Sequence, residues 1–140
     1  MEKTYLTEGQ EPESQMGAAL ESLAHTIHVR HEAADPQSYT YRLLSGDIDD
    51  LLKKLVEEAH ETTLAAKDVL RADAAPEEVD HLRYEAGDVV YHLLVLLERC
   101  GISLDEFAAE MNTRMTEDEI ALRSGVVMLK PDFVNRGSNH

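Results

Sequence analysis

The run from Val89 to Leu97 constrains the fold of this chain most strongly, because its side chains are apolar apart from Tyr91 and His92. A helix on a protein surface carries one apolar stripe and one polar face, whereas this run would be apolar on nearly every side. The run is also too short to cross a bilayer as a helix. We therefore expect it to form a buried helix.

Two pairs of acidic residues share a spacing of three. Glu58 and Glu61 form one pair, beside Glu57, and Glu85 and Asp88 form the other, directly before the apolar run. Residues three apart lie one turn above each other on a helix, so each pair presents two carboxylates on one side. A carboxylate beside a buried helix must be neutralised, hydrogen-bonded or bound to a metal. The simpler alternative is that these acids only solvate an outer helix face.

Capping and breaking residues divide the chain into predicted helices. Serine and aspartate side chains cap the start of a helix, proline suits its first turn, and glycine often ends it. These signals predict helices over residues 14–34, 38–46, 47–70 and 76–100, then one from Ser103 that carries Met111 and Met115, with a second capping box at 116–119 restarting a short helix.

The two long helices are joined by a short turn and should form an antiparallel hairpin, in which the two acid pairs lie opposite each other. A lone hairpin would bury too little of the apolar run, so we expect an all-α, four-helix-bundle-like fold completed by dimerisation. The acids should flank the core stripe of the first long helix, which is predicted to contain Ile48, Leu52, Leu55, Ala59, Thr62 and Ala66.

The predicted helices make up one domain over residues 14–115. The polar and irregular residues 1–13 are expected to form a flexible N-terminal arm. Residues 116–140 form a C-terminal extension for which the sequence suggests no chemistry.

The charge of the chain limits its partners. A formal net charge of -15 disfavours nucleic acid and anionic membranes, so a phosphate-bearing substrate would need a cation as intermediary. The single cysteine, Cys100, cannot form an internal disulfide, and the N-terminus lacks the pattern of a secretion signal. A cytoplasmic location is expected.

A cluster of carboxylates without cysteine suits a hard cation that prefers oxygen ligands, hence Mg²⁺ or Mn²⁺ ahead of zinc. Such an ion would bind the phosphates of a nucleotide and orient a water for attack on phosphorus, while a spare carboxylate accepts the proton. The acid pairs therefore indicate hydrolysis of a nucleotide pyrophosphate bond.

Other polar residues lie near the acid pairs in the sequence and are candidates for contact with a substrate. Each has an ordinary alternative role. The serine, tyrosine and arginine of the short helix could belong to a simple connector, the lysine could pair with an acid one turn on, and the tyrosine and histidine of the apolar run could be core residues. The candidates are Ser38, Tyr39, Arg42, Lys54, Tyr91 and His92.

Over roughly residues 17–115 the sequence resembles the phosphoribosyl-ATP pyrophosphatase family, within the all-α nucleotide pyrophosphohydrolase (MazG-like) superfamily. The resemblance is carried by Ser38-Tyr39-Thr40, Lys53-Lys54 before Glu57-Glu58 and Glu61, Glu85-Ala86-Gly87-Asp88, Tyr91-His92-Leu93-Leu94, and Gly101-Ile102-Ser103-Leu104-Asp105.

This resemblance implies Mg²⁺-dependent hydrolysis of phosphoribosyl-ATP to phosphoribosyl-AMP and pyrophosphate, in histidine biosynthesis, by a cytoplasmic homodimer. It implies metal ligands at Glu58, Glu61, Glu85 and Asp88, and a catalytic contribution from Glu57 together with Glu58 and Glu61. Two alternatives stay open. One is a house-cleaning pyrophosphohydrolase of the same superfamily that acts on other nucleoside triphosphates, and the other is a non-catalytic helical binding or assembly module.

Overall fold

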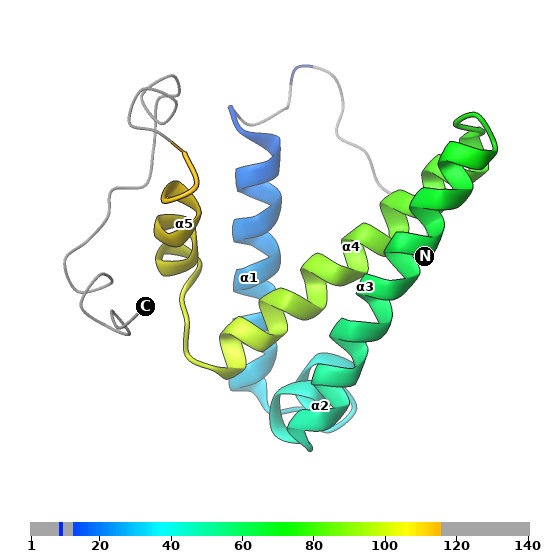
Figure 1. Cartoon of the computed structure of the whole chain (residues 1–140). Coiled ribbons are helices and arrows are strands. Elements are labelled where there is room, and N and C mark those ends of the chain that lie inside the picture. Colours follow the sequence, from blue (N-terminus) through cyan, green and yellow to red (C-terminus); the bar gives the residue numbers. More distant parts are fainter. Residues whose placement is uncertain (1–8, 10–12, 116–140) are drawn as a thin grey trace. The chain divides into compact units, whose positions relative to one another are not determined.

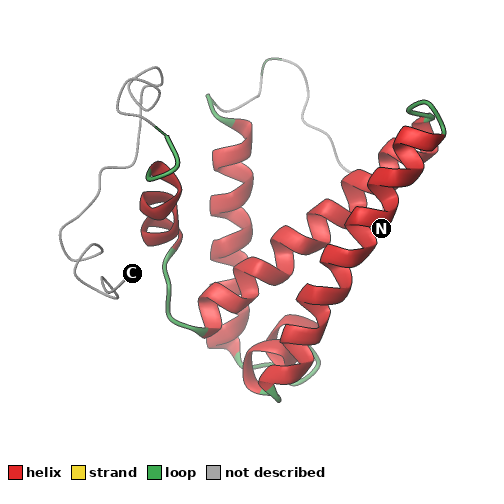
Figure 2. Ribbon diagram, viewed as in Figure 1, coloured by secondary structure: helices red, strands yellow, loops and turns green. Residues whose placement is uncertain are grey.

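A computed structural model of the chain describes Gly9 and residues 13–115, and this part is helical apart from short connections (Figure 1). No described residue lies in a β-strand (Figure 2). The prediction of an all-α fold is confirmed, whereas completion by dimerisation stays a prediction. The helices are α1 (Gln15–Ala33), α2 (Tyr39–Ser45), α3 (Ile48–Arg71), α4 (Pro76–Arg99) and α5 (Leu104–Asn112).

Parts of the predicted organisation lie outside the described residues. They are the C-terminal extension over 116–140 with its short helix, and the N-terminal arm apart from Gly9 and Glu13. Within the described part, the helix predicted to carry both Met111 and Met115 is shorter than expected. It ends at Asn112, so Met115 follows the helix.

The helix starts follow from local capping chemistry. The Ser14 side chain accepts a hydrogen bond from the Gly17 amide, and the Ser38 side chain accepts one from the Tyr41 amide. Asp47 does the same for the amide of Asp49 at the start of α3. Each of these oxygens satisfies an amide that has no partner within its own helix, which fixes where the helix begins.

The long helices α3 and α4 form the predicted antiparallel hairpin. A short turn follows Arg71, and α4 begins at Pro76 and returns alongside α3 (Figure 1). Asp73 and Ala74 in this turn have positive φ angles of 52° and 58°, which reverse the chain direction between the helices. The hairpin places the middle of α3 opposite the middle of α4.

The core of residues 13–96 lies around the short helix α2, which packs against both α1 and α3. Leu43 and Leu44 of α2 are buried. The apolar run of α4 is buried or half-buried except for Val90, which confirms most of the expected burial. The other buried apolar residues of this unit are Ile27 of α1, Leu51 and Ala65 of α3, and Leu94 and Val95 of α4.

The predicted core stripe of α3 was wrong in part, because its residues are half-buried or exposed and none is fully buried; the half-buried ones are Ile48, Leu55, Thr62 and Ala66. The helix buries Leu51, Glu58 and Ala65, while Leu52 is 40% exposed and Ala59 is exposed. One residue along a helix corresponds to a rotation of about 100°, and leucines occur at both 51 and 52, so the apolar pattern alone could not choose between the two faces. This rotation places Glu58 on the buried face instead of beside it.

Residues 97–115 belong to a second compact unit. α4 ends at Arg99, and Gly101 follows with a φ of 72°, as expected for the glycine that ends this helix. Ser103 caps α5 by accepting a hydrogen bond from the Glu106 amide, as the capping-box pattern predicted. Ala109 is the buried residue of α5.

Candidate functional site

Three of the four predicted metal ligands come together in the hairpin. Glu58 and Glu61 from α3 and Glu85 from α4 each offer a carboxylate oxygen, and these oxygens all lie within 4.8 Å of one another. We call these three residues the acid cluster. Glu58 is 9% exposed and Glu85 is 7% exposed, whereas Glu61 is exposed. The cluster is therefore buried on one side and open to solvent on the other.

The electrostatics of the cluster are dominated by acids. Burial, followed by the charges of Asp88 and Glu61, raises the pKa of Glu58 from its usual 4.5 to about 7. The influence of Asp88 places the fourth predicted ligand near Glu58, although it is not part of the tight group. A positive charge at this place would relieve the repulsion among the acids.

Glu85 carries an oxygen that the described residues do not satisfy. Its Oε1 atom lies 3.0 Å from Nε2 of His81, one turn earlier on α4. Its Oε2 atom is buried and has no hydrogen-bond partner among the described residues. A buried carboxylate oxygen without a partner is costly unless a ligand or ion occupies the position. Sequence analysis missed His81, although its spacing of four from Glu85 was a visible signal.

Tyr39, His92 and Asp88 are joined by hydrogen bonds that connect α2 to α4. Nδ1 of His92 lies 2.7 Å from the backbone oxygen of Asp88 and therefore donates to it. With Nδ1 protonated, the neutral ring accepts the proton of the Tyr39 hydroxyl at Nε2, 3.1 Å away. Burial raises the pKa of Tyr39. His92 is 4% exposed, so this arrangement fixes its ring between α2 and the turn of α4 that carries Asp88.

A second hydrogen bond joins α2 to α4 at the residues next to Tyr39 and His92. The Thr40 hydroxyl of α2 is hydrogen-bonded to the Tyr91 hydroxyl of α4, and Arg30 of α1 donates to Thr40. The Tyr39 and Tyr91 rings stack with centroids 6.5 Å apart. Thr40 is buried, and sequence analysis did not single it out as a site residue because nothing in its neighbourhood predicted a partner 51 residues away.

The remaining site candidates make local contacts. Lys54 pairs with Glu57 at 3.4 Å, and this hydrogen bond is the main reason why the pKa of Lys54 is raised. Glu57 thus points toward Lys54 and lies outside the acid cluster. Arg42 donates to the backbone oxygens of Pro36 and Gln37, and the Ser38 hydroxyl is used to cap α2. The ion pair between Lys54 and Glu57 matches the alternative in which the lysine pairs with an acid one turn on.

A model of the phosphoribosyl-ATP pyrophosphohydrolase family matches residues 20–115, which include every helix that supplies the site. The chain belongs to this family. Its assignment from the acid pairs and the surrounding motifs is confirmed.

Relatives of the phosphoribosyl-ATP pyrophosphohydrolase family support the assignment. A phosphoribosyl-ATP pyrophosphatase from Pyrobaculum islandicum is 41% identical over 96 residues, which cover 69% of this chain and 94% of the relative. Enzymes of the same name from Dechloromonas aromatica and Rhizobium etli are each 38% identical, covering 68% and 72% of this chain and 81% and 87% of those proteins. No solved structure matches the chain significantly.

The acid cluster fits the metal dependence that is general among enzymes of this family. All of its donors are carboxylate oxygens, the set that hard divalent cations prefer. The unpartnered Oε2 of Glu85 and the high pKa of Glu58 both indicate a place where positive charge is lacking. The exposed Glu61 leaves one side open, which a substrate needs in order to reach the same cation.

No helix among the described residues is long and apolar enough to cross a membrane.

Proposed function

We propose that this chain hydrolyses phosphoribosyl-ATP to phosphoribosyl-AMP and pyrophosphate, a step of histidine biosynthesis. The observation that carries the proposal is the convergence of Glu58, Glu61 and Glu85 within residues 20–115, the part of the chain that matches the family. The names of the relatives support the choice of substrate. The same convergence speaks against a helical module whose acids only face solvent.

Glu58, Glu61, Glu85 and Asp88 are the proposed ligands of Mg²⁺, which Mn²⁺ can replace. When bound, such an ion neutralises phosphate oxygens, orients a water and stabilises the pyrophosphate that leaves. The buried Glu58 and Glu85 would fix the position of the ion, because packing restricts their side chains. The exposed Glu61 would face the substrate.

The chemical step needs a proton acceptor. Water forms a bond to the α-phosphorus, the bond from that phosphorus to the bridging oxygen breaks, and pyrophosphate leaves with the electron pair. The proton of the water passes to a carboxylate, for which Glu57, Glu58 and Glu61 are the candidates. The pKa of about 7 at Glu58 belongs to the protein without a metal ion, and a bound cation would lower it by favouring the ionised carboxylate.

The polar residues around α2 would position the nucleotide. The charge of Glu58 influences the pKa values of Tyr39 and Lys54, which supports their proposed contact with a substrate bound at the acids. Arg42 and Ser38 support this surface by fixing the start of α2. Substrate contact by Tyr91 and His92 stays a prediction, and their bonds to α2 give them a positioning role in addition.

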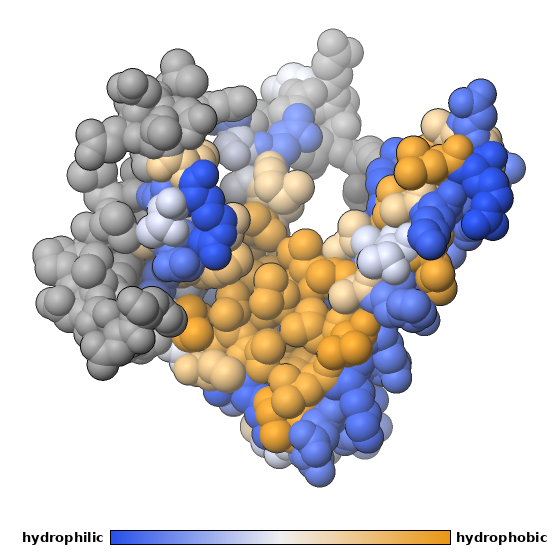
Figure 3. Space-filling view, viewed as in Figure 1, coloured by the Kyte–Doolittle hydropathy of each residue, from blue (hydrophilic) through white to orange (hydrophobic). Residues whose placement is uncertain are grey.

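We propose that the chain acts as a homodimer in the cytoplasm. Leu52 is 40% exposed and Val56 is 70% exposed, and they lie one turn apart on α3. Val90 of the apolar run is exposed as well. Figure 3 shows that hydrophobic residues gather over α4 and the neighbouring part of α3. A second copy of the chain would remove this apolar surface from water.

The function is tested by measuring pyrophosphate release from phosphoribosyl-ATP, ATP and dCTP by the purified full chain, with Mg²⁺ and with a chelator. We expect release from phosphoribosyl-ATP alone, and only with Mg²⁺. Equal release from ATP or dCTP would contradict the proposal and indicate a house-cleaning pyrophosphohydrolase. No release from any nucleotide would indicate a binding module.

A further inference from the structure

A pocket of about 450 Å³ lies between α2 and α3, outside the acid cluster. This volume falls within the range of small-molecule sites. Three cationic side chains line it, namely Arg42 from α2 and Lys53 and Lys54 from α3, together with the acidic side chains of Asp50 and Glu57. Tyr39 forms another part of the wall. The three cations outnumber the two acids, so in a chain with a formal net charge of -15 the lining is locally positive and favours an anionic ligand.

The three cations are not equally available. Lys54 is engaged by Glu57, and one nitrogen of Arg42 donates to the backbone oxygens of Pro36 and Gln37. The Lys53 side chain, by contrast, forms no ion pair or hydrogen bond with any residue in the described part of the chain. Its ammonium is therefore the group that an incoming anion can bind without displacing an existing partner.

The pocket lies apart from the acid cluster, where the pyrophosphate bond of the substrate would be cleaved. On α3, Lys53 precedes Glu58 and Glu61 by five and eight residues, which corresponds to about 8 Å and about 12 Å along the helix axis. Tyr39 lines the pocket, and the charges of Glu58 and Asp88 influence the pKa of its hydroxyl. The pocket and these acids are therefore neighbours. A separation of this size is longer than a pyrophosphate group.

We propose that this pocket binds the 5′-phosphate of the phosphoribosyl group, with Lys53 and Arg42 as its anion-binding residues. The inference rests on the proposed function, because the phosphoribosyl group is the part of the substrate that ATP lacks. With the triphosphate at the acid cluster, the second phosphate lies at the opposite end of the substrate. A phosphate held directly by lysine and arginine needs no metal ion. The pocket thus distinguishes phosphoribosyl-ATP from ATP.

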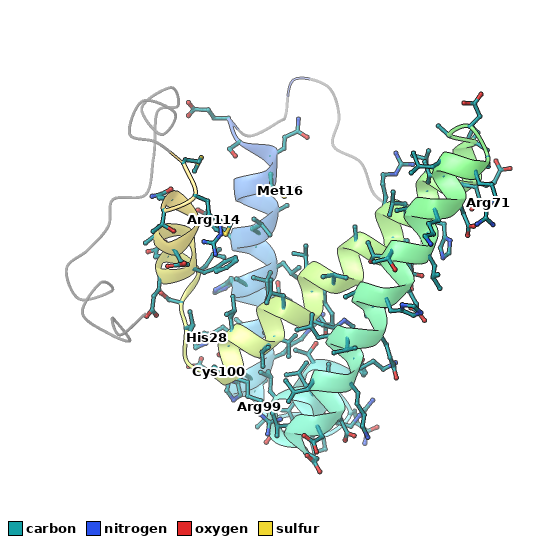
Figure 4. The ribbon with its side chains drawn as sticks, in the orientation of Figure 1. Met16, His28, Arg71, Arg99, Cys100 and Arg114 are labelled. Atoms are coloured by element: carbon teal, nitrogen blue, oxygen red, sulfur yellow. The ribbon has the colours of Figure 1, made fainter. Side chains whose placement is uncertain are left out.

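The kinetic test replaces Lys53 with methionine, which keeps most of the apolar stem of the side chain and removes its charge. Arg71→Met is the matched control, since it removes one positive charge from the same helix about 27 Å away, at the turn end labelled in Figure 4. For Lys53→Met we expect the KM for phosphoribosyl-ATP to rise roughly tenfold, while the affinity for ATP measured as a competitor is unchanged. Equal loss for both ligands would assign the pocket to the phosphate chain and overturn the proposal, and so would no loss for either.

A second measurement does not depend on turnover. Ribose 5-phosphate is titrated into the isotopically labelled full chain in the presence of a chelator, and backbone amide shifts are followed by NMR. We expect saturable shifts at Arg42 and Lys53 for the wild type and Arg71→Met, and none for Lys53→Met or for ribose without its phosphate. Absence of shifts in the wild type would overturn the pocket assignment. Shifts together with a lack of phosphoribosyl-ATP hydrolysis would refute the proposed function and leave the phosphate pocket supported.

Discussion

The hydroxyl of Tyr39 lies 3.1 Å from Nε2 of His92, a residue 53 positions later in the chain. The other ring nitrogen of His92 donates to the backbone oxygen of Asp88. Two hydrogen bonds on one buried ring therefore connect α2, which lines the cationic pocket, to the turn of α4 that carries an acidic residue of the site. The position of α2 relative to the acids depends on this connection.

Replacing Tyr39 with phenylalanine tests the connection. The substitution leaves the buried Nε2 of His92 without its partner, so we expect the free energy of unfolding to fall by about 1–3 kcal/mol. Urea unfolding of the metal-free protein measures the change. Tyr41→Phe is the control, because the Tyr41 hydroxyl makes no hydrogen bond within the described residues. Equal effects of the two substitutions would contradict a specific role for the bond.

The raised pKa of Glu58 makes the stability of the metal-free protein depend on pH. Between the usual 4.5 and about 7, folded Glu58 keeps a proton that the unfolded chain has lost. The free energy of unfolding should therefore decrease as pH rises through this window, by up to about 1.4 kcal/mol per pH unit, and level off above it.

Glu58→Gln isolates this contribution, since glutamine is uncharged at every pH in the window. We expect the variant to gain stability relative to the wild type as pH rises toward 7, when both are unfolded by urea in the presence of a chelator. A stability difference that does not change with pH would contradict the assignment of the raised pKa to Glu58.

The proposed dimer predicts that an acidic residue at Val56 separates the subunits. Val56→Asp places a charge on the exposed apolar surface of α3, so we expect a monomer by sedimentation. Met16→Asp is the matched control: Met16 is 69% exposed, close to the 70% of Val56, and lies near the start of α1 (Figure 4). A wild type that is monomeric at all concentrations would contradict the dimer, and dissociation by both substitutions would contradict this interface.

The helices could be predicted because their signals are local. Ser14, Ser38 and Ser103 each cap a helix through an amide three residues away, and such contacts depend only on neighbouring residues. The antiparallel hairpin follows in the same way from the short turn before Pro76. The spacing of the acids on α3 and α4 then suffices to bring Glu58 and Glu61 near Glu85.

The environment of the site could not be predicted, because it depends on how the helices are rotated. Glu58 is buried because α3 packs through Leu51, whereas the apolar pattern predicted the face that contains Leu52. The hydrogen bond between Tyr39 and His92 and the pocket beside Lys53 arise from contacts between separate helices. Hydrophobic periodicity gives the faces of a helix but not its partner.

Binding of Mg²⁺ to the acid cluster tests the central claim most directly. Glu61 is exposed, so Glu61→Gln removes a proposed ligand without disturbing the core, and Glu77→Gln on the outer start of α4 is its control. We expect calorimetric titration to show saturable Mg²⁺ binding by the wild type and Glu77→Gln, and affinity at least about tenfold weaker for Glu61→Gln. Unchanged Mg²⁺ affinity in Glu61→Gln would contradict a metal site built from Glu58, Glu61 and Glu85.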